Sequence, residues 1–142
     1  MLFSEAKGRK VVSTSTAETV GKVNGFLVDP AQSVIIAIEL KKTDGGDTLH
    51  WPDVEAFGTD AVTVLDAGKI TDASSEAAAL AGKEHHLLDK RVLTTAGDER
   101  GKVDDVEFDK ESGAITMLVL GDGELPGSAL VGIGSYAVVV RS

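Results

Sequence analysis

The sequence predicts a mainly all-β fold: two small β-barrels in tandem with one short connecting helix. The nine residues from Gly101 repeat those from Gly21 at an offset of 80 residues, with Gly, Lys, Val and Asp at matching places. Both copies continue into apolar runs rich in β-branched residues, which favour strands, at residues 35–40 and 115–120. Turn-forming residues follow each run. Such coincidence indicates that one unit occurs twice.

The repeat sets the predicted domain boundaries. A first unit is expected at residues 1–66, a linker that holds the short helix at 67–82, and a second unit at 83–142. A unit of about 60 residues is marginally stable, because it buries only about 60% of the surface that its unfolded chain exposes. We therefore expect the two units to pack on each other or across a contact with a second subunit.

Composition and charge restrict the function classes. Of the 142 residues, 42% are hydrophobic and 26% charged, as is typical of a folded protein. The net charge of −9 disfavours direct contact with nucleic acid or with anionic lipid. The absence of cysteine excludes disulfides, thiolate metal sites and thiol nucleophiles. The first residues show neither a leader nor a membrane span, so we expect a cytoplasmic protein.

The first strand is expected at residues 10–13, and the repeated stretch begins the second. In the second strand the apolar residues are three apart, which breaks the two-residue period of a strand. A β-bulge that adds one residue restores the phase. We therefore expect bulges at Asn24-Gly25 and at Asp104-Asp105. They leave two matched sets of inward-facing residues: Val23, Phe26 and Val28 in the first copy, and Val103, Val106 and Phe108 in the second.

A hairpin loop follows in each copy. Asp29 and Asp109 begin these loops, where an Asp side chain accepts a backbone N–H, and Pro30 fixes φ in the first loop. The strand after the loop is apolar on both faces. One face is expected to line the barrel, and the other to meet the second copy or another subunit. The positions expected to form this pseudo-twofold or side-by-side contact are Ile36, Ile38, Leu118 and Leu120.

The two copies diverge after Leu40 and Leu120. The first copy holds four more residues before its last strand, and insertions of this kind fall in loops. Each copy ends with a Gly-containing turn and a last strand. Between the copies, hydroxyl N-caps, an alanine run and a terminating glycine predict a short helix at residues 75–81. No other segment has a helical pattern.

Part of this pattern resembles a known family. The residues that carry the resemblance are Arg91-Val92-Leu93-Thr94-Thr95, the stretch from Gly101 to Val106, Asp109, Ile115 to Leu120, and Ala137-Val138-Val139. They look like the PRC-barrel domain, and the first copy matches it more weakly. The resemblance covers nearly all of both copies and implies a stand-alone tandem PRC-barrel protein.

The resemblance implies a function class without a chemistry. PRC-barrel domains occur in the cytoplasmic part of the photosynthetic reaction-centre H subunit. They also form the C-terminal part of a ribosome maturation factor that binds a small-subunit ribosomal protein. The chain shows neither the membrane anchor of the first nor the separate N-terminal domain of the second. In this family the barrel mainly serves as a protein-docking module.

Candidate chemistry is sparse. Glu84, His85 and His86 are candidate metal ligands, but adjacent side chains in an extended segment point apart, so we expect no metal there. His50 and Asp53 with a nearby serine would suggest a hydrolase, but no nucleophile elbow is present. We therefore expect no catalytic residues, no cofactor and no metal.

The candidate docking residues are one aromatic side chain and a group of carboxylates. Acidic residues gather between residues 98 and 111, where they form either a solvated face or a docking surface for a basic partner. Trp51 is the only tryptophan, and tryptophan is enriched at interfaces, although packing within a small barrel is the favoured reading. Gly127 is expected at the matching position of the second copy. The candidate set is Trp51, Asp104, Asp105, Glu107 and Asp109.

The sequence therefore predicts a non-catalytic protein-docking or adaptor module, self-associating as a homodimer, with an unknown protein partner. An alternative is a ribosome- or RNA-processing-associated factor that acts through a ribosomal protein. The net charge argues against direct RNA contact in that role. An enzyme is the third reading, and only the histidines and carboxylates support it.

Overall fold

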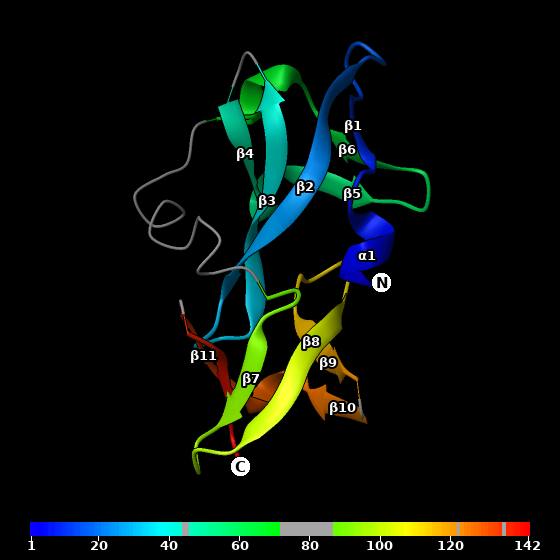
Figure 1. The fold of residues 1–142 in the computed structure, drawn as a ribbon. Coiled ribbons are helices and arrows are strands. Elements are labelled where there is room, and N and C mark those ends of the chain that lie inside the picture. Colours follow the sequence, from blue (N-terminus) through cyan, green and yellow to red (C-terminus); the bar gives the residue numbers. More distant parts are fainter. Residues whose placement is uncertain (44–45, 72–86, 122, 135) are drawn as a thin grey trace.

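A computed structural model describes residues 1–43, 46–71, 87–121, 123–134 and 136–142. Two six-stranded sheets form two barrel-like units, which confirms the mainly β fold class (Figure 1). The predicted helix at residues 75–81 and the histidine pair at 85–86 lie outside the described residues. No helix in the described part of the chain is both long enough and apolar enough to cross a membrane.

The first unit begins with a short helix that the sequence pattern did not indicate, so the expectation of no other helix is wrong. Its strand order is β4-β3-β2-β1-β6-β5, with β1 and β6 parallel and the other neighbours antiparallel. The elements are α1 (Phe3–Ala6), β1 (Lys10–Ser13), β2 (Thr19–Asp29), β3 (Val34–Thr43), β4 (Gly46–His50), the 3-10 turn η1 (Trp51–Asp53), β5 (Val54–Phe57), β6 (Ala61–Val64) and η2 (Ala67–Lys69).

The second unit repeats this topology. Its strand order is β10-β9-β8-β7-β12-β11, again with one parallel pair, β7 and β12. The elements are β7 (Arg91–Thr94), β8 (Glu99–Phe108), β9 (Ile115–Leu120), β10 (Gly123–Pro126), η4 (Gly127–Ala129), β11 (Leu130–Ile133) and β12 (Val138–Val140). β3 has ten residues and β9 six, so the first copy's extra residues lengthen the hairpin between β3 and β4.

Both predicted bulges are present. The register of β2 against β3 shifts between Val23 and Gly25, and that of β8 against β9 shifts between Val103 and Asp105. One added residue therefore restores the inward phase of each strand. The two predicted sets of inward residues are all buried: Val23, Phe26, Val28, Val103, Val106 and Phe108.

The two hairpin loops are closed by the predicted aspartates. The Asp29 carboxylate accepts a hydrogen bond from the Ala31 backbone N–H at 2.9 Å, and that of Asp109 accepts one from Glu111 at 2.8 Å. Ser33 and Gly113 end the loops with positive φ of 53° and 78°. Glycine adopts that conformation at lower cost than serine.

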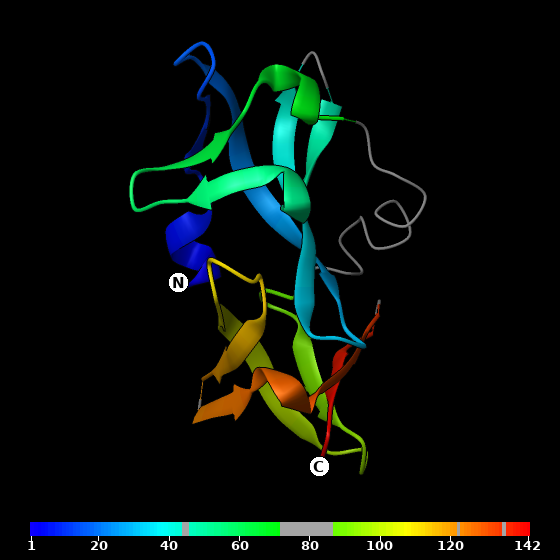
Figure 2. The same ribbon diagram turned by 180° about the vertical axis from the view of Figure 1, so that it is seen from behind.

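The units meet through these loops with local twofold symmetry. The Ile35 N–H donates to the Gly113 carbonyl, and the Ile115 N–H donates to the Ser33 carbonyl, both at 2.8 Å. Each partner in one bond lies 80 residues from its counterpart in the other, and a Val34–Ala114 bridge lies between them. From behind, the loop after β2 reaches down to the second unit (Figure 2). The pseudo-twofold contact is therefore present.

The residues that were expected to form this contact lie elsewhere in the structure. Ile38, Leu118 and Leu120 belong to the buried core rather than to an outer surface, and Ile36 is only partly buried. A second register shift in each pairing adds one residue to β3 at Ile36 and one to β9 at Thr116, and this turns the side chains that follow inward. The described hydrogen bonds between the two hairpins come from the starts of β3 and β9 instead, at Ile35 and Ile115, on either side of the Val34–Ala114 bridge. The expectation was thus correct on symmetry and wrong on residues.

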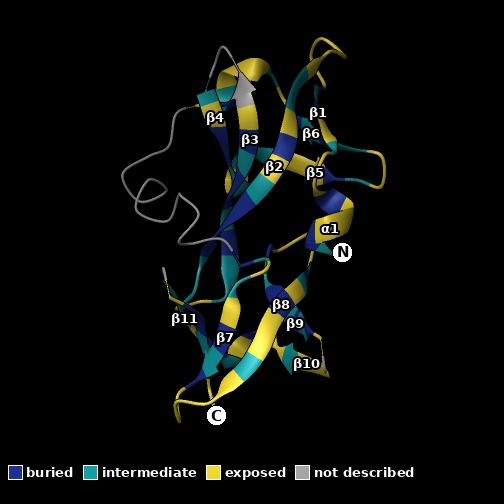
Figure 3. Cartoon of the chain, in the orientation of Figure 1, coloured by how far each residue is buried: buried dark blue, intermediate teal, exposed yellow. Residues whose placement is uncertain are grey.

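One hydrophobic core runs through both units. It includes β-strand residues of each barrel and all four phenylalanines of the chain (Figure 3). Phe108 is the one aromatic residue that the second unit contributes to the junction. Its ring centroid lies 5.3 to 5.6 Å from those of Phe3, Phe26 and Phe57. The junction is therefore an aromatic cluster that neither unit completes alone.

Candidate functional site

Trp51 packs at the junction between the two units. It begins η1, is partly buried, and lies 6.1 Å from the Phe57 ring and 6.3 Å from the Phe108 ring. A Cβ added to Gly113 would lie 3.0 Å from the Trp51 indole, so the ring rests on a loop of the second unit. This placement accords with a packing role for Trp51.

Gly127 occupies the matching position, as the first residue of η4. A Cβ at Gly127 would stand 1.8 Å from the Ile115 carbonyl oxygen, so no side chain fits there. The Gly127 carbonyl accepts a hydrogen bond at 2.8 Å from the Ser33 hydroxyl of the first unit. Each 3-10 turn thus contacts the hairpin loop of the other unit. The turn η1 does so through the indole of Trp51, and η4 does so through the backbone of Gly127.

Two of the candidate carboxylate residues contact the chain's own N-terminal segment. The Asp105 carboxylate accepts hydrogen bonds from the Ser4 hydroxyl and from the Ser4 N–H, the latter at 3.2 Å. Leu2 forms an antiparallel bridge with Glu107. The Phe108 N–H donates to the Met1 carbonyl at 2.8 Å. Residues 1–4 therefore lie along β8, where α1 is seen beside the second unit (Figure 1).

The other two carboxylates are also separate from each other. Asp109 is exposed and has a depressed pKa, because its charged form accepts backbone N–H bonds from Glu111 and then Ser112. Asp104 is exposed on β8 and accepts no side-chain hydrogen bond from residues that the structure describes. The five candidate residues thus lie in four places and do not converge on one surface. Trp51 lies at the junction, Asp105 and Glu107 contact the N-terminal segment, Asp109 lies in a loop, and Asp104 lies on β8.

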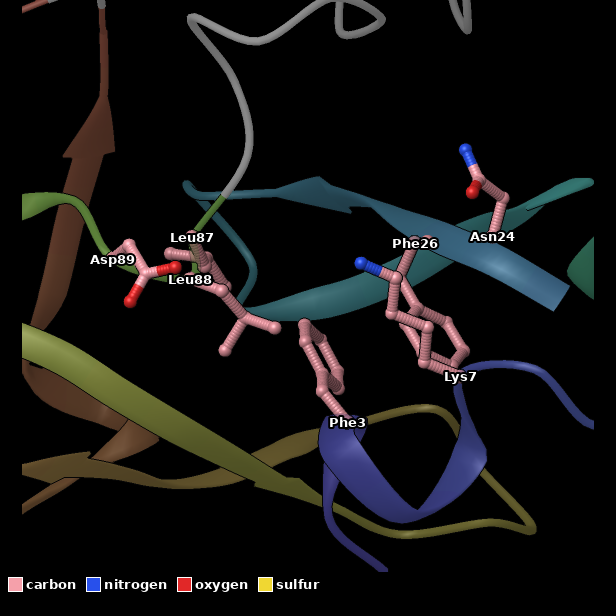
Figure 4. A pocket seen from close by; sticks show the side chains of 8 residues that line it. Phe3, Lys7, Asn24, Phe26, Leu87, Leu88 and Asp89 are labelled. Atoms are coloured by element: carbon pink, nitrogen blue, oxygen red, sulfur yellow. The ribbon is translucent and has the colours of Figure 1, made fainter.

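A small cavity of about 250 Å³ lies between α1, β2 and residues 87–89 (Figure 4). Phe3 and Phe26 stack in it with centroids 4.4 Å apart, and Lys7 and Asp89 lie among its lining residues. Across the described ranges, no group of three or more His, Cys, Asp or Glu side chains could hold a metal ion. The cavity offers an apolar wall and no assembled chemistry.

An exposed apolar surface lies on the outer side of β7, β12 and β11. We call it the β11 face and define it as Leu93, Val131, Tyr136 and Val139. Two of these side chains are among the large hydrophobic residues that remain exposed: Tyr136 at 62% and Val131 at 43%. Leu93 pairs with Val139, which also pairs with Gly132.

A charged pair flanks the β11 face. The Arg91 guanidinium lies 4.9 Å from the Tyr136 ring centroid, a cation–π geometry. Its Nε is 2.7 Å from the Glu99 carboxylate. Lys90 adds a second cation at this margin, where its Nζ donates to the Gly134 carbonyl at 2.9 Å.

Comparison with known proteins identifies the second unit. The family model described as "PRC-barrel domain" matches residues 84–141, a range that includes β7 to β12. The match covers 58 of the 142 residues, and we call the second unit the PRC-barrel domain after it. No curated protein matches the chain. The β11 face is thus the outer surface of one side of the PRC-barrel domain, and the first unit has the same strand order without that surface.

Sequence reasoning missed the β11 face, although the repeat held the signal for it. The segment around Tyr136 was interpreted only as a turn before the last strand. The parallel pair β1–β6 of the first unit matches the pair β7–β12 of the PRC-barrel domain. At the outward positions, the first pair has Val12 and Thr63 where the second has Leu93 and Val139. At the bulges of β5 and β11, Glu55 stands where the domain has Val131. A position-by-position comparison of outward residues would have found the difference.

Proposed function

We propose that the chain is a non-catalytic protein-docking module, in a role that includes self-association, and that the β11 face is its docking surface. The observation that carries this proposal is the exposed apolar group around Tyr136 on a PRC-barrel domain. Contiguous exposed apolar surface on a folded protein marks a contact site. Tyrosine and arginine, the pair at this margin, are enriched among residues that dominate binding energy.

The charge distribution also supports a protein partner. The chain has a net charge of −9, yet the β11 face holds only uncharged side chains and borders an arginine–glutamate pair. Depletion of charge at the centre and polar groups at the margin are typical of protein interfaces. A phosphate backbone would find no concentration of free cations there.

The test is affinity capture at native expression level, with a variant that blocks the face and a matched control. Gly132→Glu places a charge in the middle of the β11 face. Gly123→Glu places the same charge on β10, at the opposite edge of the same sheet. A Cβ at either glycine meets no atom within 4 Å, so both variants should fold.

We expect at least one specific protein to be captured by the wild type and by Gly123→Glu, and lost with Gly132→Glu. Capture that is indifferent to both variants would refute the β11 face as the docking surface. Salt-sensitive RNA binding that survives Gly132→Glu would favour the RNA-processing alternative instead.

A further inference from the structure

We infer that the occupant of the β11 face is a second copy of this chain, related by a twofold axis. This inference rests on the proposed docking function and names its partner. In such an isologous contact the same patch lies on both sides, so the patch must be complementary to itself in shape and in charge.

The β11 face meets the requirement of shape, because it has both a projection and a hollow. Tyr136 projects and is 62% exposed. Its ring forms one wall of a shallow hollow of about 410 Å³ that Leu93 and Val139 also help to line. Gly132 and Gly134 leave the hollow open, since neither has a side chain and a Cβ at either would meet no atom within 4 Å. A twofold axis lets the tyrosine of each copy enter the hollow of the other.

The face also meets the requirement of charge. Two chains of net charge −9 repel each other over most of their surfaces. Residues 130–134 carry no ionisable side chain, and the charged groups beside them already have partners: Arg91 pairs with Glu99 at 2.7 Å, and Lys90 Nζ donates to the Gly134 carbonyl at 2.9 Å. A copy therefore meets an uncharged centre and charges that are already bonded at the margin. A strongly acidic or basic partner, in contrast, would gain little from electrostatic complementarity with this uncharged surface.

The four sheet edges differ in protection, and β11 is the apolar one. β10 carries Glu124 and ends at Pro126, β5 carries Glu55, and Thr48 of β4 exchanges two backbone bonds of 2.9 Å with Thr71. Charges, prolines and covering segments are the usual means of keeping an edge from association. β11 has only the bulge at Val131, which bends the edge, so we place the contact on the face rather than in strand pairing.

The required area is within reach of the chain. A standard interface buries about 800 Å² on each partner. The accessible surface of the chain is 7267 Å², so a dimer contact would take about a ninth of it. The β11 face extends over three strands and can form the centre of such a contact.

The test is the mass of the purified chain over a range of concentrations, by sedimentation equilibrium. We expect the wild type and Gly123→Glu to reach twice the 14.7 kDa chain mass. Gly132→Glu should raise the dimer dissociation constant at least tenfold, because two introduced carboxylates would face each other near the axis. Tyr136→Ala is the second variant. It removes the projecting ring without touching the core, and it should also weaken the dimer at least tenfold.

The outcomes separate the inference from the function on which it rests. A wild type that stays monomeric at all concentrations refutes the second copy, and if capture still depends on Gly132, the docking function stands with another protein as occupant. A dimer that neither Gly132→Glu nor Tyr136→Ala weakens refutes the β11 face as its site. Circular dichroism of each variant establishes that any loss of mass is not a loss of fold.

Discussion

The two units of this chain share an architecture and differ in what they present. Both have the same strand order, the same bulges after Val23 and Val103, and the same aspartate-closed hairpin loop. The first unit supplies most of the aromatic cluster at the junction, whereas the PRC-barrel domain supplies Phe108 alone. The outer face of the PRC-barrel domain has Val139 and Val131 where the first unit has Thr63 and Glu55, although Leu65 is an exposed apolar residue of the first unit.

This difference teaches which positions the fold constrains. Inward positions are mostly apolar in both units, with Ser13, Thr48 and Thr94 as buried polar residues, because each barrel must exclude water from its interior. Outward positions are free to change, and at the bulge of the fifth strand the chain has Glu55 in one unit and Val131 in the other. A substitution at outward positions can therefore give one copy of the duplicated unit a binding surface that the other copy lacks, without a change of fold.

The largest expected effect comes from removing the ring that joins the units. Phe108 is 1% exposed and contacts aromatic side chains of the first unit. Phe108→Ala should lower the free energy of unfolding by about 3–5 kcal/mol, as is typical of a buried phenylalanine. Urea denaturation, followed by circular dichroism and by the fluorescence of the single tryptophan Trp51, measures it.

The same experiment tests whether the units are one cooperative body. Trp51 lies 6.3 Å from Phe108, so its fluorescence reports on the junction, whereas circular dichroism reports on both sheets. In the wild type we expect the two transitions to coincide. Val106→Ala, inside the PRC-barrel domain, is the matched core control and should leave them coincident. Separate transitions in the wild type would contradict the shared core.

A smaller effect should follow from the asymmetry between Trp51 and Gly127. Gly127→Ala forces a Cβ to within 1.8 Å of the Ile115 carbonyl, a backbone atom that cannot rotate away. We expect a loss of about 1–3 kcal/mol, the usual cost of overpacking. Gly123→Ala, in the neighbouring strand, meets open space and should change stability by less than about 0.5 kcal/mol. Equal effects of the two substitutions in thermal denaturation would show that this turn is not tightly packed.

The smallest effect concerns the hairpin loop of the PRC-barrel domain. Hydrogen bonds from the backbone N–H groups of Glu111 and Ser112 hold the pKa of Asp109 below the ordinary value of an aspartate. A carboxyl group whose pKa is lower in the folded than in the unfolded state stabilises the fold. This stabilisation is complete at a pH above the unfolded-state pKa, and it is lost as the pH falls through the folded-state pKa. The stability advantage of the wild type over Asp109→Asn should therefore shrink as pH falls from about 5 to about 2.

Urea midpoints across that range measure the advantage. Asp104→Asn is the control, since Asp104 lies on the same strand region and accepts no side-chain hydrogen bond within the described part of the chain. An advantage for Asp109 that stays constant with pH would contradict a role for its charge in the loop.

Much of the fold was predictable because its signals are local. The three-residue spacing of Val23 and Phe26 admits few explanations in a strand, and the bulge is one of them. The leading aspartates and the β-branched runs specify turns and strands through short-range chemistry. These features need no knowledge of what the other unit does.

The remaining features depend on contacts between distant parts of the chain. α1 has four residues and no helical pattern, and it is held by contacts with β8 about 100 positions away. The roles of Asp105 and Glu107 could not be predicted, because nothing in their own neighbourhood shows that residues 1–4 lie against them. The β11 face was missed because apolar residues in a short strand are ordinarily assigned to the core.

The pairing of residues 1–4 with β8 has a consequence for biosynthesis. The Met1 nitrogen donates to the Phe108 carbonyl across 107 positions of sequence, so one partner emerges from the ribosome long before the other. At about 5–20 residues per second, the wait lasts roughly 5 to 20 s. For about the last half of it, from the synthesis of Phe57 onward, Phe3, Phe26 and Phe57 are present but lack the ring that completes their cluster. The nascent first unit is therefore a candidate for chaperone capture, and the order of synthesis makes the PRC-barrel domain the part that ends this exposure.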